Sequence, residues 1–298
     1  MRRLFFACFV FSFSPFHVLA QNEIIVQSAH YPEGLFWDNR TDSLYYAEMP
    51  HDRVMRYNNT RSTVFFENEG CGPTSMAPIG VQWAITCHFG RSLIITDHHG
   101  RLVEEIKTDN RGEKLQNPND IVSLGSGVYL TDSGSFNPNA TASGAIFYWS
   151  QEHGMERIIG GLHYANGVTV DSNGETLFVS EHLGRRILAF PIIGKGELGL
   201  PRIFANLESK LALLGPLTGP DGLEFGSNGR LYAAIYGAGR IMVFDVTGTY
   251  VRSLARPETY LTTVSFLKGG NAIFAAGAFN NVLFPYAGNI TRINLDAD

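Results

Sequence analysis

The sequence contains few charged side chains and no cluster of basic ones. Only 17% of its 298 residues are Asp, Glu, Lys or Arg, and 28 acidic residues outnumber 23 basic ones, for a net charge of −5. A surface that binds the phosphate backbone of DNA or RNA needs a concentration of Lys and Arg. The charge pattern therefore argues against a nucleic-acid partner.

Long apolar segments are missing beyond the N-terminus. Residues 1–20 combine a basic start, a run of about ten apolar residues from Leu4 to Phe13, and small residues ending at Ala20, which is the pattern of a secretory signal peptide. A membrane anchor is the alternative, but so short a run does not span a bilayer. We therefore predict cleavage after Ala20, a secreted product with no membrane attachment, and a single mature domain over residues 21–298.

Cysteine is also rare, with three residues in the chain. Cys8 lies in the predicted signal peptide, so Cys71 and Cys87 remain. In an oxidising compartment the two can pair, whereas two buried free thiols are the alternative, and the sequence leaves this open. Glycosylation sequons agree with a eukaryotic secretory route and make the mature product a candidate glycoprotein. They begin at Asn39, Asn58, Asn139 and Asn289.

The signatures of several large enzyme classes are absent. The chain has no Gly-x-Ser-x-Gly elbow, no His-Glu-x-x-His zinc motif, no P-loop and no dinucleotide-binding glycine run after a strand. Its histidines are scattered, and an isolated histidine is more often a structural residue than a catalyst. They include His51, His88, His98, His99, His163 and His182.

Glycine, aromatic residues and short apolar strands are abundant instead. The 32 glycines and the 12% aromatic content favour an all-β protein with many turns. A turn followed by an apolar strand and a second strand recurs along the chain, most clearly at 171–190 and 226–245. The equivalent strand starts lie 39 to 54 residues apart, at Leu44, Trp83, Val128, Leu177, Leu231 and Ile273.

A repeat of this length with several short strands per unit is typical of β-propellers. Six repeats predict an all-β, six-bladed β-propeller. We expect the N-terminal segment 23–27 to pair with the C-terminal segment 290–295, because this closure removes exposed sheet edges. The only helical expectation is one short turn within 207–214.

A second motif precedes four of the strand starts by about ten residues. It places an acid or amide at the same point of these four repeats, and the remaining two repeats have hydroxyl residues near that point. Equivalent positions of a propeller are related by rotation about its central channel, so we expect these side chains to converge. They are Glu33, Asn119, Asn166 and Asp221, with Thr74 and Thr263 as approximate counterparts.

Two carboxylates and two amides form a set of hard oxygen donors. Such a set suits Ca²⁺, with Mg²⁺ or Mn²⁺ as alternatives, and disfavours Zn²⁺. Asn-Gly and Asp-Gly are also ordinary turn dipeptides, but their common phase in four repeats favours a metal site. Asp132 lies beside the channel strand of the third repeat and is a candidate to support the site, a turn aspartate being the alternative.

Several stretches resemble the senescence-marker-protein/gluconolactonase/luciferin-regenerating family, over about residues 24–290. They are EGLFWD (33–38), NPNDIV (117–122), YLTDSG (129–134), ANGVTVDSNGETLFVSE (165–181) and PDGLEFGSNGRLY (220–232). The resemblance implies a six-bladed propeller with one divalent cation in its channel, Ca²⁺ first, although the family also tolerates Mg²⁺, Mn²⁺ or Zn²⁺. It implies metal ligands at Glu33, Asn166 and Asp221, with Asn119 as a further metal or substrate contact. The implied reaction is hydrolysis of a sugar-like lactone.

The chain departs from the family at two places. Asn117 stands where some family lactonases carry an arginine that binds substrate hydroxyls, so Asn117 is a candidate substrate contact and the substrate stays open. The stretch TTVSF (262–266) replaces an Asn-containing stretch that is common in gluconolactonases. We expect the metal to survive both changes.

The mechanism we predict is metal-assisted ester hydrolysis by a monomer acting on a small-molecule lactone or ester. The cation polarises the carbonyl, and Asp221 acts as the catalytic base that delivers water. Two alternatives remain. One is an organophosphate or aryl ester hydrolase that uses the same cation, and the other is a secreted binding module without catalysis.

Overall fold

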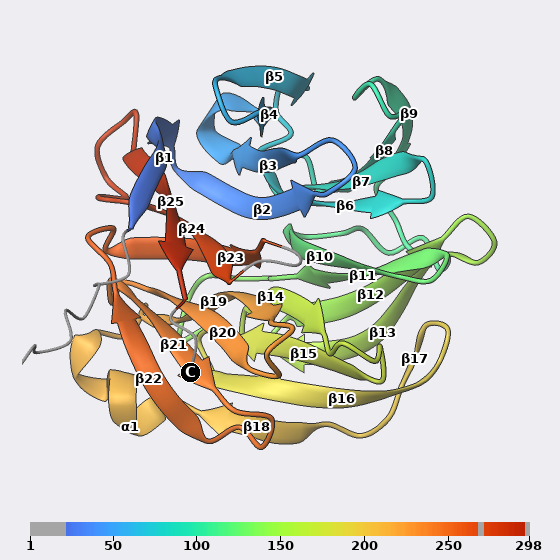
Figure 1. The fold of residues 1–298 in the computed structure, drawn as a ribbon. Helices are drawn as coiled ribbons and strands as arrows, with labels where there is room; N and C mark the ends of the chain where they lie inside the picture. The colour runs from blue at the N-terminus through green and yellow to red at the C-terminus, as the bar shows by residue number, and fades with distance from the viewer. Residues whose placement is uncertain (1–21, 268–270, 296–298) are drawn as a thin grey trace, which may run out of the picture.

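The computed structural model describes residues 22–267 and 271–295 (Figure 1). The predicted signal peptide lies outside the described residues. Antiparallel strands make up nearly all of the regular structure, and most of them form consecutive meanders. Within the described parts of the chain, no helix has the length and apolar character needed to cross a membrane.

The first three sheets have four strands each, and each sheet follows the order of the chain. The first contains β2 (Pro32–Asp38), β3 (Ser43–Glu48), β4 (Arg53–Tyr57) and β5 (Ser62–Glu67). The second contains β6 (Pro73–Ile79), β7 (Gln82–Cys87), β8 (Ser92–Thr96) and β9 (Leu102–Ile106). The third contains β10 (Pro118–Leu124), β11 (Gly127–Asp132), β12 (Gly144–Ser150) and β13 (Gly154–Leu162).

The fourth sheet has five strands, because its third strand pairs with two short segments. Its members are β14 (Ala165–Val170), β15 (Thr176–Glu181), β16 (Arg186–Gly194), β17 (Glu197–Leu198) and β18 (Arg202–Asn206). Among the residues that the structure describes, helical structure is limited to α1 (Glu208–Leu211) and two 3₁₀ turns, η1 (Met49–His51) and η2 (Ala212–Leu214). The helical turn expected within 207–214 is confirmed.

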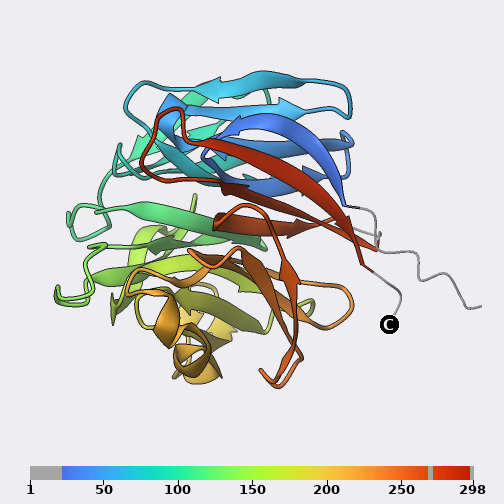
Figure 2. The ribbon, with the colours of Figure 1, turned by 90° about the vertical axis from the view of Figure 1, so that its left-hand side faces the viewer.

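The last sheet joins two meanders through one pair, Tyr236 with Tyr260. One meander contains β19 (Gly219–Phe225), β20 (Leu231–Tyr236), β21 (Arg240–Phe244) and β22 (Tyr250–Ala255). The other contains β23 (Tyr260–Phe266), β24 (Ala272–Ala278), β25 (Ala287–Asn294) and the N-terminal β1 (Glu23–His30). β1 runs antiparallel beside β25 (Figure 2), which confirms the predicted pairing of the two ends of the chain.

The sheets are arranged as in a β-propeller, with the first strand of each meander innermost. β2 contacts β6, and contacts continue through β10, β14, β19 and β23 back to β2. Apolar side chains fill the space between the faces of neighbouring sheets, for example Tyr45 of β3 against Trp83 of β7. The second strand of each meander begins within one residue of the start predicted from the repeat.

Each innermost strand has a β-bulge at the second sequence motif. Register shifts fall between Glu33 and Leu35 in β2, and at the corresponding places of the other five innermost strands. A bulge bends the strand and redirects a side chain. The Asn-Gly and Asp-Gly pairs therefore lie within bulged strands, and the turn interpretation of these dipeptides is wrong.

The glycine of the motif is required by the close approach of the next innermost strand. A Cβ at Gly34 would lie 2.5 Å from the Cα of Ser75, and one at Gly222 would lie 2.7 Å from the carbonyl oxygen of Thr262. Real side chains do not tolerate such contacts with a backbone. The motif thus combines a polar side chain with a glycine that lets the strands close around the channel.

Candidate active site

The motif side chains converge on one cavity of about 530 Å³ at an end of the central channel. Five innermost strands each supply one of them to the lining: Glu33 (β2), Thr74 (β6), Asn119 (β10), Asn166 (β14) and Asp221 (β19). The sequence prediction that these residues meet is confirmed, whereas their roles stay predictions.

Two predicted neighbours lie elsewhere. The bulge of β23 shows that Thr262, not Thr263, is the sixth counterpart, and Thr263 lines the cavity at the other end of the channel. Asn117 is not among the residues that line the candidate site. Its backbone N–H donates to Oδ1 of Asp132, 2.8 Å away, and its carbonyl accepts from Ser133. Buried Asp132 therefore fixes the segment that leads into Asn119.

Of the two carboxylates of the site, Asp221 is buried and Glu33 is partly buried, and both lie close to further negative charge. Burial raises the pKa of Glu33 well above its usual value, and the nearby charges of Asp221 and Asp120 raise it further. Burial likewise raises the pKa of Asp221, with Asp120 as the second cause. Like charges held together without solvent destabilise the ionised forms, and a bound cation relieves that repulsion.

Asp120 is a residue that the sequence analysis did not single out, although it follows Asn119 in the motif. Its Oδ2 accepts a hydrogen bond from the backbone of Val168 at 2.8 Å, and its Oδ1 accepts from Ile121 at 2.9 Å. Asp120 therefore ties β10 to β14 directly beneath the site.

The two amides are held by their nitrogen atoms, which leaves their oxygens available. Nδ2 of Asn119 donates to Oγ of Ser133 at 2.9 Å. Nδ2 of Asn166 lies 3.5 Å from Nδ1 of His182, and the same side chain donates a hydrogen bond to Asp221. Both amides can thus present oxygen, the atom that Ca²⁺ and Mg²⁺ prefer, to the cavity.

His182 is the second residue that the sequence analysis missed as part of the site. Its Nε2 lies 3.1 Å from the carbonyl oxygen of Leu217, so this nitrogen carries the hydrogen, and Nδ1 is left as an acceptor 3.7 Å from Oδ2 of Asp221. Burial lowers the pKa of His182 to about 4, which keeps the ring neutral near pH 7. His182 therefore positions Asn166 and adjoins Asp221.

Buried hydroxyls connect neighbouring sheets at the backbone of the site residues. Thr86 donates to the carbonyl of Asn119 at 2.6 Å, and Ser180 donates to that of Asp221 at 2.7 Å. Thr131 does the same for Asn166 at 2.5 Å. Each donor lies on the second strand of one sheet and bonds to the site residue of the sheet that follows it along the chain. These bonds therefore fix the position of each site residue relative to the neighbouring sheet.

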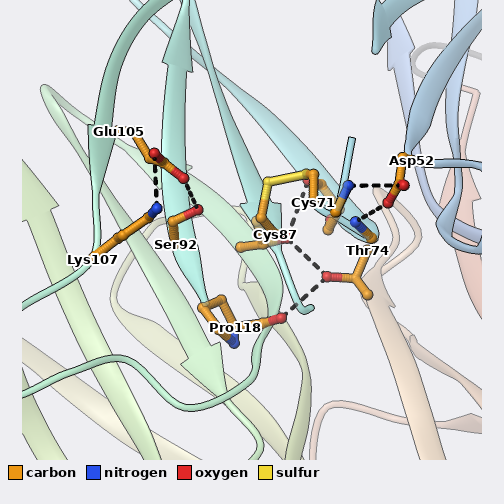
Figure 3. Close-up of a disulfide and its surroundings, with 12 residues drawn as sticks. Asp52, Cys71, Thr74, Cys87, Ser92, Glu105, Lys107 and Pro118 are labelled. Carbon is orange, nitrogen blue, oxygen red and sulfur yellow. Dashed lines mark hydrogen bonds and ion pairs between the residues drawn. A yellow bond between two sulfur atoms is a disulfide. The ribbon is translucent and has the colours of Figure 1, made fainter. Parts of the chain in front are cut away.

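A disulfide joins Cys71 to Cys87 beside the cavity, which settles the question that the sequence left open (Figure 3). The backbone of His88 donates to the carbonyl of Gly72 at 3.0 Å, directly beside the bridge. His88 and the following Phe89 both line the cavity. The disulfide therefore anchors one part of the cavity wall.

The sequence of this chain matches one family model. The model describes the SMP-30/gluconolactonase/LRE-like region and covers residues 31–274. The chain belongs to this family. Among curated relatives, the lactonase drp35 of Staphylococcus haemolyticus is 24% identical over 239 residues, which is 76% of this chain and 69% of the relative.

Solved structures show the same fold. A gluconolactonase from Xanthomonas campestris has a TM-score of 0.76 at 20% identity, over 93% of this chain and 90% of the other. The calcium-binding protein regucalcin from Agrobacterium tumefaciens has a TM-score of 0.76 at 15% identity, over 93% and 94% of the two chains. Together with the family match, these findings support a lactonase-type hydrolase with a propeller fold.

The donor set fits a hard divalent cation and not a zinc ion. In the described ranges, no three His, Cys, Asp or Glu side chains lie close enough to hold a metal. The candidate set instead contains two carboxylates, of which Asp221 raises the pKa of Glu33, and two amides whose nitrogens bond to other protein groups. This combination is typical of Ca²⁺ or Mg²⁺ ligation by oxygen.

Proposed function

We propose that the protein is a hydrolase that opens a lactone and depends on one divalent cation, with Ca²⁺ as the first choice. The observation that carries the proposal is the convergence of Glu33, Asn119, Asn166 and Asp221 on one cavity, where the nitrogens of both amides are engaged by neighbouring side chains. The family match to lactone hydrolases supports the substrate type.

We also infer that the propeller has six blades. The inference is supported by the circuit of contacts through the six innermost strands and by the six apolar clusters between neighbouring meanders. The pairing of β1 with β25 places strands from both ends of the chain in one blade. Such a ring holds six equivalent bulges around one axis.

Hydrolysis follows from the groups around the cavity. A bound cation would supply Lewis-acid polarisation of the carbonyl and a lowered pKa for water. Asp221 would accept a proton from the attacking water as an ionised carboxylate, the form that a bound cation favours. The water oxygen bonds to the carbonyl carbon, the ring C–O bond breaks, and the leaving oxygen takes the proton to give a hydroxy acid.

We further propose that the protein is secreted and glycosylated. The Cys71–Cys87 disulfide supports an oxidising compartment. Three of the sequon asparagines, Asn39, Asn58 and Asn139, are exposed and accessible to a glycan. The fourth, Asn289, is buried in β25, so we do not expect modification there.

The proposal is tested with the purified mature protein and a panel of lactones and aryl esters. We expect hydrolysis that EDTA abolishes and that Ca²⁺, Mg²⁺ or Mn²⁺ restores. An organophosphate or aryl ester preference without lactone turnover would favour the related esterase. Tight cation binding with no turnover of any ester would favour a binding module.

A further inference from the structure

We infer that the cavity takes an aromatic or similarly apolar lactone or aryl ester, not a polyhydroxylated sugar lactone. This inference deepens the proposed hydrolase function and rests on it. Polar ligating groups occupy one part of the cavity, whereas aromatic rings form most of the remaining lining. A substrate with a carbonyl at one end and a flat apolar body matches that division.

One aromatic cluster surrounds Phe136. Its ring centroid lies 4.6 Å from that of Tyr164 and 5.5 Å from that of His182, and Tyr236 is edge-on at 6.4 Å. Phe136 nevertheless remains 40% exposed. An aromatic side chain that is packed by rings on one side and open on the other is suited to contact a flat apolar ligand.

The mouth of the cavity continues this apolar character. Phe284 packs edge-on against Tyr286, and Tyr286 packs in the same way against Tyr31. Phe284 and Phe89 are 67% and 56% exposed, yet both line the cavity. Covering this apolar surface with a ligand is favourable because it removes apolar area from water.

Several polar atoms of the walls are already engaged with the protein, whereas buried Nδ1 of His88 has no partner. The hydroxyls of Tyr31 and Tyr236 lie 3.0 Å apart, and Tyr236 also accepts from Nδ2 of Asn281 at 3.0 Å. The hydroxyl of Tyr164 bonds to Ser133, and Nε2 of His182 bonds to a backbone carbonyl. A sugar lactone would leave hydroxyls without partners in such a site, and this mismatch costs affinity.

The lining also contains no permanent cation. None of the described residues around the cavity is Lys or Arg. Burial lowers the pKa of His88 to about 4, so that ring is uncharged near neutral pH, and Nε2 of His182 already bonds to the carbonyl of Leu217. The walls therefore offer no charged donor for the hydroxyls of a sugar or for a phosphate.

The test compares two δ-lactones, 3,4-dihydrocoumarin and D-glucono-δ-lactone, on the Ca²⁺-supplemented protein. We expect kcat/KM to favour dihydrocoumarin by about a hundredfold or more, since several buried aromatic contacts each contribute up to about tenfold. Phe136→Ala should raise KM for dihydrocoumarin by about tenfold with a smaller change in kcat. The matched control is Phe279→Ala, because Phe279 is 43% exposed and lies outside the cavity lining.

Binding is measured separately by calorimetry with coumarin as the probe. We expect Phe136→Ala, but not Phe279→Ala, to weaken coumarin binding by about tenfold. A preference for gluconolactone, or coumarin binding that is indifferent to Phe136→Ala, overturns the aromatic substrate class and leaves the hydrolase intact. Coumarin binding that depends on Phe136, without hydrolysis of either lactone, overturns the proposed function and supports the binding specificity.

Discussion

Replacing Thr131 by valine removes a hydroxyl that joins two innermost strands at the candidate site. Thr131 is fully buried, and its Oγ1 donates to the carbonyl of Asn166 at 2.5 Å and accepts from the backbone N–H of Asp120 at 3.0 Å. Valine keeps the size and branching of threonine, so the change leaves two backbone groups without partners and creates no cavity. Each such group costs about 1–3 kcal/mol, and we expect the free energy of unfolding to fall by about 3 kcal/mol.

Equilibrium unfolding in urea measures this loss. The matched control is Thr63→Val on β5, where the hydroxyl is exposed and has one long contact, 3.5 Å from the carbonyl of Arg56. That variant should stay within about 0.5 kcal/mol of the parent. If Thr131→Val were as stable as Thr63→Val, the claim that the buried hydroxyls hold neighbouring sheets together at the site would be wrong.

Three further predictions concern charge, catalysis and the disulfide. The native pKa of His182 is about 4, below that of an unfolded histidine, so the unfolded state takes up a proton first as pH falls below 6.5. Stability should therefore drop by about 2 kcal/mol between pH 7.5 and pH 5, and urea titrations of His182→Gln should lack this part of the loss. Asp221→Asn should reduce lactone turnover by at least about a hundredfold, and full activity with bound metal would refute its role as base. Replacing Cys71 and Cys87 by serine, which opens a loop with a sequence separation of 16, should lower the free energy of unfolding by about 3 kcal/mol, measured in urea.

Periodicity is the reason that so much of the fold could be predicted. The second strand begins at the same point of each repeat, and because it is buried on both faces it is visible in the sequence as a short, mostly apolar run. The same phase relation identified Glu33, Asn119, Asn166 and Asp221, because rotation about one axis brings equivalent positions together. Thr263 was misplaced by one residue, since a bulge shifts the register in a way that no pattern of apolar residues reveals.

The remaining parts of the site have weaker signals in the sequence. The position of His182 after β15 is repeated in one other blade, where His88 follows β7, and two histidines do not mark a repeat. Phe136 lies in the connection after β11. The proximity of Phe136 and His182, with ring centroids 5.5 Å apart, is a property of the assembled structure. The pairing of Cys71 with Cys87 likewise depends on a strand register that spacing alone does not give.

The most direct measurement of the central claim is calcium titration of the metal-free mature protein by calorimetry, with lactone hydrolysis followed on the same samples. We predict one Ca²⁺ per chain, activity that rises in parallel with occupancy, and loss of both in a Glu33→Gln, Asp221→Asn double variant. Hydrolysis that persists at full rate in EDTA, or Ca²⁺ binding that is unchanged in the double variant, would contradict a metal centre formed by these residues.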